Sequence, residues 1–157
     1  MAKYQFRNMK QLKNGIDVQI KNILNNLTND VYNELYNNVK ENIYEWQPSK
    51  YSRTMQVLES ISKTKILHTG SGYKVYIYFD VDKIVPEYRM PNEWNAHASF
   101  DNSEVDGNDL LGWLEYGTDS MFYSHSESKF YRDTLEWLYY EFNTMVKTKL
   151  IKCGFKI

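Results

Sequence analysis

Apolar residues recur every three or four positions through the first third of this 157-residue chain. After Gly15 the repeat runs through Ile16, Ile20, Ile23, Leu27, Val31, Leu35, Val39 and Ile43. That stride matches the 3.6-residue period of an α-helix. It predicts one amphipathic helix from Asp17 to about Glu45, on the order of 43 Å long at 1.5 Å per residue. We expect the helix to stop before Pro48, because a proline disfavours the α conformation of the residue that precedes it.

Asparagine is frequent on the other faces of this predicted helix. The positions are Asn22, Asn25, Asn26, Asn29, Asn33, Asn37, Asn38 and Asn42. Each asparagine costs roughly 0.5 kcal/mol of helix stability relative to alanine, so packing must hold the helix together. The surface that it packs on is either the domain's own sheet or a neighbouring subunit, and the sequence leaves both open.

A two-residue period follows between Tyr73 and Val81. One face of the predicted strand carries Tyr73, Val75, Ile77, Phe79 and Val81, and the other carries Lys74, Tyr76, Tyr78 and Asp80. This alternation is typical of a strand. The glycines around Ser71 predict that the strand belongs to a hairpin turning at residues 70–72. The tyrosines on the second face indicate that this face too is partly covered.

Two further elements complete the predicted fold. Residues Leu111 to Tyr116 are aromatic and aliphatic and precede a Gly-Thr stop, which favours a short strand. Ser124 and Glu127 stand at the spacing of a capping box before a last helix. Its expected buried stripe is Phe130, Leu135, Leu138, Phe142, Met145, Val146 and Leu150, and Gly154 suits the position after its C-cap.

Length and pattern together predict a single α+β domain over residues 1–157. In this fold a long N-terminal helix and a C-terminal helix pack on a small, mostly antiparallel β-sheet. The single cysteine, Cys153, cannot form an intramolecular disulfide, and the N-terminus lacks the apolar region of a signal peptide. We therefore expect a soluble protein that is assembled in the cytoplasm of its host and does not enter a membrane.

Charge is distributed unevenly although the net charge is −1. Residues 1–16 form a predicted basic N-terminal arm without acidic side chains, and residues 83–110 form a predicted long acidic loop. Residues 80–109 hold eight acidic and two basic side chains, a balance of −6. In a ring of identical subunits, a basic terminus that meets the neighbour's acidic loop would fix register and orientation. Solvated faces and a flexible tail explain the same distribution.

The candidate subunit-interface residues follow from this charge pattern and from the high tyrosine content, 14 residues. Tyrosine is common on surfaces that contact partners, although a biased genome composition would also enrich it. The candidates are Arg7, Lys10, Tyr76, Tyr78, Trp94, Asp101, Glu104, Asp106 and Asp109.

No motif predicts catalysis, a cofactor or a metal site. The three histidines lack paired spacing. Residues 102–107 place oxygen ligands and a glycine as a calcium loop does, but Trp113 occupies the position of the required glutamate. Cys153 stands near the end of a helix rather than at its start, where the helix dipole would favour a reactive thiolate. We therefore expect no enzyme activity and no cofactor.

Two segments resemble a known family. The first is the run from Trp46 to Ile61, with Pro48, Tyr51, Arg53-Thr54 and Ser60-Ile61, and the second is Leu114-Glu115-Tyr116-Gly117-Thr118. Set between two long helices and beside a tyrosine-rich strand, they resemble the small tailed-bacteriophage proteins of the neck and tail-completion (minor tail component) type. In that family these positions are turn and packing positions and not catalytic ones.

The resemblance implies a structural virion protein at the head-to-tail junction. It would complete the tail and join it to the head connector as part of an oligomeric ring, which in related particles is six-fold or twelve-fold. Its neighbours would be the head connector or stopper and the tail terminator or tube. DNA would pass through the channel without specific binding, and an acidic lining would repel phosphate.

Three alternatives remain at this stage. The chain could be a component of a phage-derived tail-like particle. It could be a small nucleic-acid-binding module that uses the tyrosine-rich strand for base stacking. It could also be a small hydrolase or nuclease with a site in the acidic loop, which would require gathered carboxylates with shifted pKa values.

Overall fold

The computed structural model describes residues 7–45, 55–84, 106–120 and 123–156. Its architecture is α+β, as predicted, with two long helices and short antiparallel strand pairs.

The first helix, α1, runs from Met9 to Val39 and continues into a π-helical turn, η1, from Lys40 to Tyr44. Its end agrees with the prediction, but it begins earlier than Asp17. The Asn8 side chain caps the helix by accepting a hydrogen bond of 3.0 Å from the backbone N–H of Gln11. Such a cap satisfies one of the free N–H groups of the first turn. Residues 9–16 of the expected basic arm are therefore helical.

A long hairpin follows the short helix α2, Gln56–Ser60. Strand β1, Ile61–Lys63, pairs with β4, Ile77–Phe79, and β2, Leu67–Thr69, pairs with β3, Gly72–Lys74. Because Thr69 pairs with Gly72, the turn consists of Gly70 and Ser71, within the predicted range. The predicted alternation is also confirmed, since Tyr76 and Tyr78 are exposed while Val75 and Ile77 are partly buried.

The hairpin contains a one-residue shift between its two strand pairs. Three residues, 64–66, lie opposite two residues, 75 and 76. The backbone N–H of Thr64 donates to the Tyr76 carbonyl oxygen at 3.0 Å, and the Tyr76 N–H donates to the Thr64 hydroxyl at 3.1 Å. An extra residue of this kind is a β-bulge, which exchanges the faces of all later residues on its strand.

Helix α3, Gly107–Tyr116, replaces the strand predicted for Leu111–Tyr116. The side chain of Asp106 accepts the backbone N–H of Asp109 at 3.0 Å, and the side chain of Asp109 accepts the N–H of Asp106 at 3.2 Å, which completes a capping box. The leucines at positions 110, 111 and 114 pack on the core at a helical spacing. The predicted stop is correct, because Gly117 has φ 76° and ends the helix.

The last helix, α4, runs from Phe130 to Lys152. It follows a strand pair formed by β5, Thr118–Ser120, and β6, Tyr123–His125. The predicted capping box of Ser124 and Glu127 is wrong, since the N-cap residue is Lys129 with φ 54° and no side-chain cap of its own. Gly154 has φ 88°, as its predicted position after the C-cap requires.

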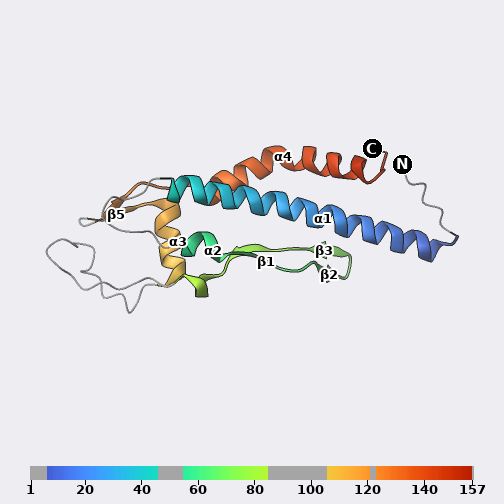
Figure 1. Cartoon of the computed structure of the whole chain (residues 1–157), viewed down its shortest axis with the longest axis horizontal. Helices are drawn as coiled ribbons and strands as arrows, with labels where there is room; N and C mark the ends of the chain where they lie inside the picture. Colours follow the sequence, from blue (N-terminus) through green and yellow to red (C-terminus); the bar gives the residue numbers. More distant parts are fainter. Residues whose placement is uncertain (1–6, 46–54, 85–105, 121–122, 157) are drawn as a thin grey trace.

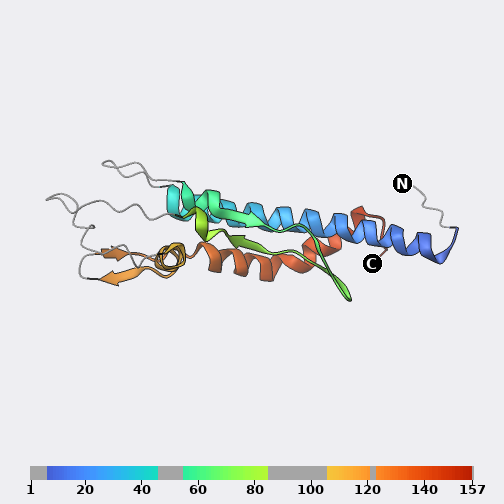
Figure 2. The same ribbon diagram turned by 90° about the horizontal axis from the view of Figure 1, so that it is seen from below.

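Helices α1 and α4 lie antiparallel and side by side, and the hairpin crosses the face of this pair (Figures 1 and 2). The Asn38 side chain donates a hydrogen bond of 2.9 Å to the Thr134 hydroxyl, and Lys149 forms an ion pair with Asp30. The two helices therefore pack on each other as well as on the strands.

The buried core lies at one end of this elongated arrangement. It consists of Leu35, Val39, Ile43, Tyr44, Val57, Leu58, Ile61, Ile84 and Phe130. Val39 has no exposed surface, and the ring of Phe130 meets that of Phe79 edge to face at 5.6 Å. The last turns of α1, the base of the hairpin and the first turn of α4 thus share one core, which α3 covers (Figure 1). Of the predicted α4 stripe, Leu135 and Phe142 remain about half exposed.

We predict opposite effects for alanine at the two glycines of α3. A methyl group at Gly107 would lie 2.8 Å from the Val81 carbonyl oxygen, so Gly107→Ala should destabilise the fold by about 1–3 kcal/mol. Gly112 has open space around it, so Gly112→Ala should stabilise the fold by about 0.5–1 kcal/mol. Chemical denaturation measures both free energies of unfolding, and equal effects of the two substitutions would contradict the close approach at Gly107.

Candidate interaction surfaces

A cavity of about 480 Å³ lies between α1, the tip of the hairpin and α4. Its apolar wall is formed by Ile20, Ile23, Leu24, Leu27, Val146 and Leu150. The hairpin contributes His68 and Tyr73, whose rings meet edge to face at 5.2 Å, and Lys13 and Asp17 add charge. The cavity can accept an apolar group, and within the described ranges no three potential metal ligands gather anywhere.

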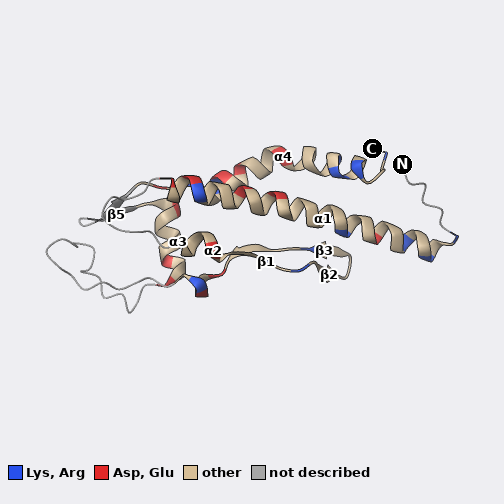
Figure 3. Ribbon diagram, in the orientation of Figure 1, with Lys and Arg blue, Asp and Glu red and all other residues tan. Residues whose placement is uncertain are grey.

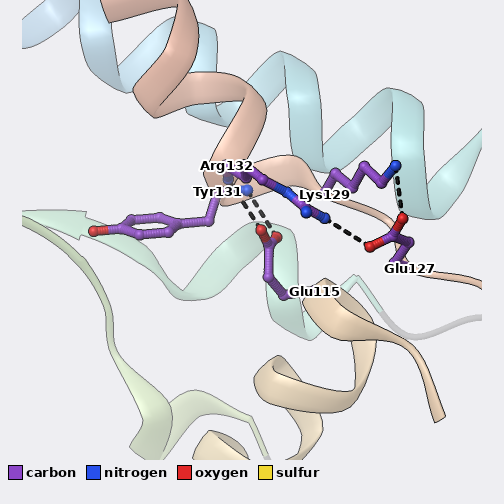
Figure 4. Close-up of polar contacts among 5 residues, drawn as sticks. All are labelled: Glu115, Glu127, Lys129, Tyr131 and Arg132. Carbon is purple, nitrogen blue, oxygen red and sulfur yellow. Dashed lines mark hydrogen bonds and ion pairs between the residues drawn. The ribbon is translucent and has the colours of Figure 1, made fainter. Parts of the chain in front are cut away.

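The carboxylate of Glu115 is the central polar group of the opposite end (Figure 4). It is only 4% exposed, and it accepts the backbone N–H groups of Tyr131 at 2.9 Å and Arg132 at 3.0 Å. These are N–H groups of the first turn of α4, which have no partner inside a helix. A residue of α3 thus supplies the N-terminal cap of α4, and its negative charge also favours that end of the helix dipole.

Glu127 forms a second, exposed polar group beside this cap (Figure 4). Its carboxylate contacts Lys129 at 2.6 Å and Arg132 at 2.8 Å. Hydrogen bonds from Lys129 and then Arg132 lower the pKa of Glu127 below its ordinary value. Because the pKa is lower in the folded state, this contact stabilises the protein above the unfolded-state pKa. The contribution disappears as the pH falls through the folded-state pKa.

The predicted interface tyrosines lie on the outward face of the hairpin. Tyr76 and Tyr78 are each nearly half exposed. The Lys74 ammonium donates a hydrogen bond of 2.8 Å to the Tyr76 hydroxyl. The structure therefore offers an exposed aromatic surface with an adjacent cation, whereas the strand pattern indicated that this face is partly covered.

The predicted acidic candidates divide into two groups. Asp106 and Asp109 form the capping box of α3, and hydrogen bonds from the Asp109 N–H and then from the side chain and N–H of Asn108 lower the pKa of Asp106. The first role of Asp106 and Asp109 is therefore to cap the N-terminus of α3. Asp101 and Glu104 lie outside the described residues, as does Trp94, and so does most of the predicted loop over residues 83–110.

The basic candidates Arg7 and Lys10 stand at the exposed start of α1. The backbone N–H of Arg7 donates to the Gln11 side chain at 2.9 Å, which places this residue against the first turn. Their side chains therefore belong to a helix end and not to a separate arm.

Several exposed apolar side chains on α4 were not among the predicted interface residues. Tyr139 is 79% exposed and Tyr140 is 68% exposed, and their rings meet edge to face at 5.3 Å. Leu135 and Phe142 lie on the same side of the helix as Val146, which lines the cavity. The sequence gives only the helical stripe that contains Leu135 and Phe142, and Tyr139 and Tyr140 lie outside that stripe.

Charge separates along the long axis of the molecule (Figure 3). Lysines gather at the end that holds the start of α1 and the last turns of α4, whereas acidic side chains dominate α3 and the first half of α4. A molecule with opposite charge at its two ends favours an end-to-end approach of identical copies.

The fold thus defines an elongated α+β protein with its core at one end and open apolar faces along the rest. This chain belongs to the YomN family, whose model matches residues 8–153, and the family is phage-related. No curated protein and no solved structure matches the chain. Ser60, Ile61 and Glu115, three of the residues that carried the resemblance to phage neck proteins, are buried and have packing or capping roles.

In the described part of the chain, no helix combines the length and the apolar character needed to cross a membrane.

We predict that Glu115 is important for stability and Glu127 is not. Glu115→Ala should destabilise the fold by about 1–3 kcal/mol, because two part-buried N–H groups of the first turn of α4 lose their acceptor. Glu127→Gln removes an exposed charge at the same helix end and should have a much smaller effect. Thermal and urea unfolding of the two variants test this. A loss from Glu127→Gln as large as that from Glu115→Ala would contradict the cap.

Proposed function

We propose that this protein is a structural component of the phage neck. In this role it completes the tail and joins it to the head connector as a subunit of an oligomeric ring. Its neighbours are the head connector or stopper and the tail terminator or tube, and DNA passes through the channel without specific binding. It has no catalytic activity and is located in the virion after assembly in the host cytoplasm.

The observation that carries this proposal is the open apolar surface of the described residues. Large apolar side chains are exposed on three elements, and they include Ile16 and Val18 on α1, Tyr76 and Tyr78 on the hairpin, and Tyr139 and Tyr140 on α4. Extended apolar surfaces on a folded protein usually mark interaction sites. An enzyme of this size would rather gather polar groups in one enclosed pocket.

The phage-related family and the shape of the molecule add support. A small core holds one end together while the helices and the hairpin project away from it (Figure 2). Projecting elements of this kind can each contact a different neighbour. The six-fold or twelve-fold order of the ring is carried over from the resemblance of residues 46–61 and 114–118 to phage neck proteins.

Deletion of the gene from a phage that encodes this chain tests the proposal. We expect filled heads and unattached tails to accumulate, and we expect the wild-type gene in trans to restore infectious particles. Two complementing variants separate an effect of the α4 surface from an effect on expression. Tyr139→Ala with Tyr140→Ala changes the surface, and the single exposed change Asn26→Ala is the matched control. Electron microscopy and plaque counts are the readouts.

Mass spectrometry of purified particles adds an independent measurement, in which the chain should be present in a copy number divisible by six. Normal particle yield after deletion, or absence of the chain from particles, would overturn the proposal. Recovery of the chain only in headless tails would instead assign it to a phage-derived tail-like particle.

The exposed tyrosines of the hairpin support nucleic-acid binding as a second candidate function. Lys74 beside Tyr76 and the exposed Tyr78 resemble the cation and stacking groups of single-strand binders. In this case a labelled oligonucleotide should bind more weakly at 200 mM than at 50 mM salt, and Tyr76→Ala with Tyr78→Ala should reduce binding about tenfold. The pair Tyr139→Ala with Tyr140→Ala serves as the control, and unchanged binding by the hairpin variant would exclude this function.

A further inference from the structure

The first turns of α1 project beyond the rest of the described structure. They pass both the C-terminal end of α4 and the tip of the hairpin (Figures 1 and 2). We name residues 7–16 the α1 overhang. Met9 is 78% exposed and Ile16 is also exposed, although both continue the apolar stripe of the helix. A helical segment of this length is marginal in water when its apolar face has no partner.

The α1 overhang has an apolar stripe with a basic edge. Met9, Leu12 and Ile16 stand at a helical spacing on one side, while Lys10 and Lys13 lie together beside the stripe. Its described residues contain no acidic side chain, and Asp17 is the first acid after it. A surface that covers this stripe must therefore be apolar and must carry negative charge along one edge.

The α1 overhang of one copy is a poor partner for the α1 overhang of another copy. Pairing two copies through the same surface would bring Arg7, Lys10 and Lys13 of both copies together. Like charges placed opposite each other at an interface oppose association. Charge therefore excludes an isologous contact here and favours a contact with the acidic end.

The first half of α4 provides a surface with the required character. We name Asp133, Glu136, Tyr139 and Tyr140 the α4 patch. Residues three, four and seven positions apart are neighbours on a helix surface, so Asp133, Glu136 and Tyr140 form one row with Tyr139 beside it. The two tyrosines are the most exposed aromatic pair of this helix, and Glu136 is exposed between them and Asp133.

We propose that the α1 overhang of one copy packs on the α4 patch of the next copy. The apolar stripe covers Tyr139 and Tyr140, and Lys10 and Lys13 approach Asp133 and Glu136. The two surfaces lie at different ends of the chain, so the contact is heterologous. Such a contact closes into a ring or extends into a filament. This inference rests on the proposed function, because it names the subunit contact of the proposed ring.

Charge reversal tests the contact in the full-length protein. We expect concentration-dependent self-association that weakens between 50 mM and 500 mM salt in sedimentation velocity and native mass spectrometry. Lys10→Glu with Lys13→Glu should weaken self-association about tenfold at low salt, and Asp133→Lys with Glu136→Lys should weaken it similarly. Mixing the two variants should restore it, since each then offers complementary charges to the other.

A matched control changes the same charge at the same end but outside the overhang. Lys152→Glu with Lys156→Glu should leave self-association nearly unchanged, and circular dichroism confirms that each variant keeps its helices. A monomeric wild type at low salt, stronger association after Lys10→Glu with Lys13→Glu, or equal loss in the control would each overturn the contact. If the chain still joins heads to tails in phage, the proposed function survives that failure.

Discussion

The fold depends on the burial of apolar side chains at one end of the molecule. Val39 near the end of α1 and Phe130 at the start of α4 are enclosed there together with residues of α2 and β1. Burial of a side chain of this size contributes about 1.5–3 kcal/mol, and much of the described structure is connected through this cluster. The same cluster limits the rest, because a core confined to one end leaves the distant turns of α1 and the hairpin tip with few internal contacts. The elongated shape and the open apolar surfaces therefore have the same cause, a core that is confined to one end of the molecule.

Periodicity in the sequence predicted the elements that are regular over many residues. The long stride of α1, the alternation from Tyr73 and the last helix all appear in the structure. Residues 111–116 belong to a helix and not to the predicted strand. The prediction was wrong because Trp113 and Tyr116 favour strands and the run is too short for composition to decide. The better signal was the pair Asp106 and Asp109, which caps a helix. Asp106 and Asp109 form a local hydrogen-bond motif, which their charge alone does not reveal.

The interaction surfaces were only partly predictable, for a physical reason. A helical residue can be placed on a face from sequence, but whether that face is covered depends on distant elements. The pattern of α4 predicts a buried stripe, yet Leu135 and Phe142 within it are about half exposed. Glu115 was known only as part of a motif, because its partners, the N–H groups of Tyr131 and Arg132, lie 16 and 17 residues along the chain.

The β-bulge in the hairpin determines which side chains the hairpin contributes to the lining of the cavity. Without the extra residue between β1 and β2, the alternation from Ile61 would turn Leu67 inward and His68 outward. With it, Leu67 lies opposite Lys74 on the outer face, and His68 faces the cavity beside Tyr73. The apolar part of the recess thereby gains an imidazole, a group that can donate or accept a hydrogen bond. One inserted residue thus places a hydrogen-bonding ring on the hairpin side of the cavity, in addition to the charged groups of Lys13 and Asp17 on α1.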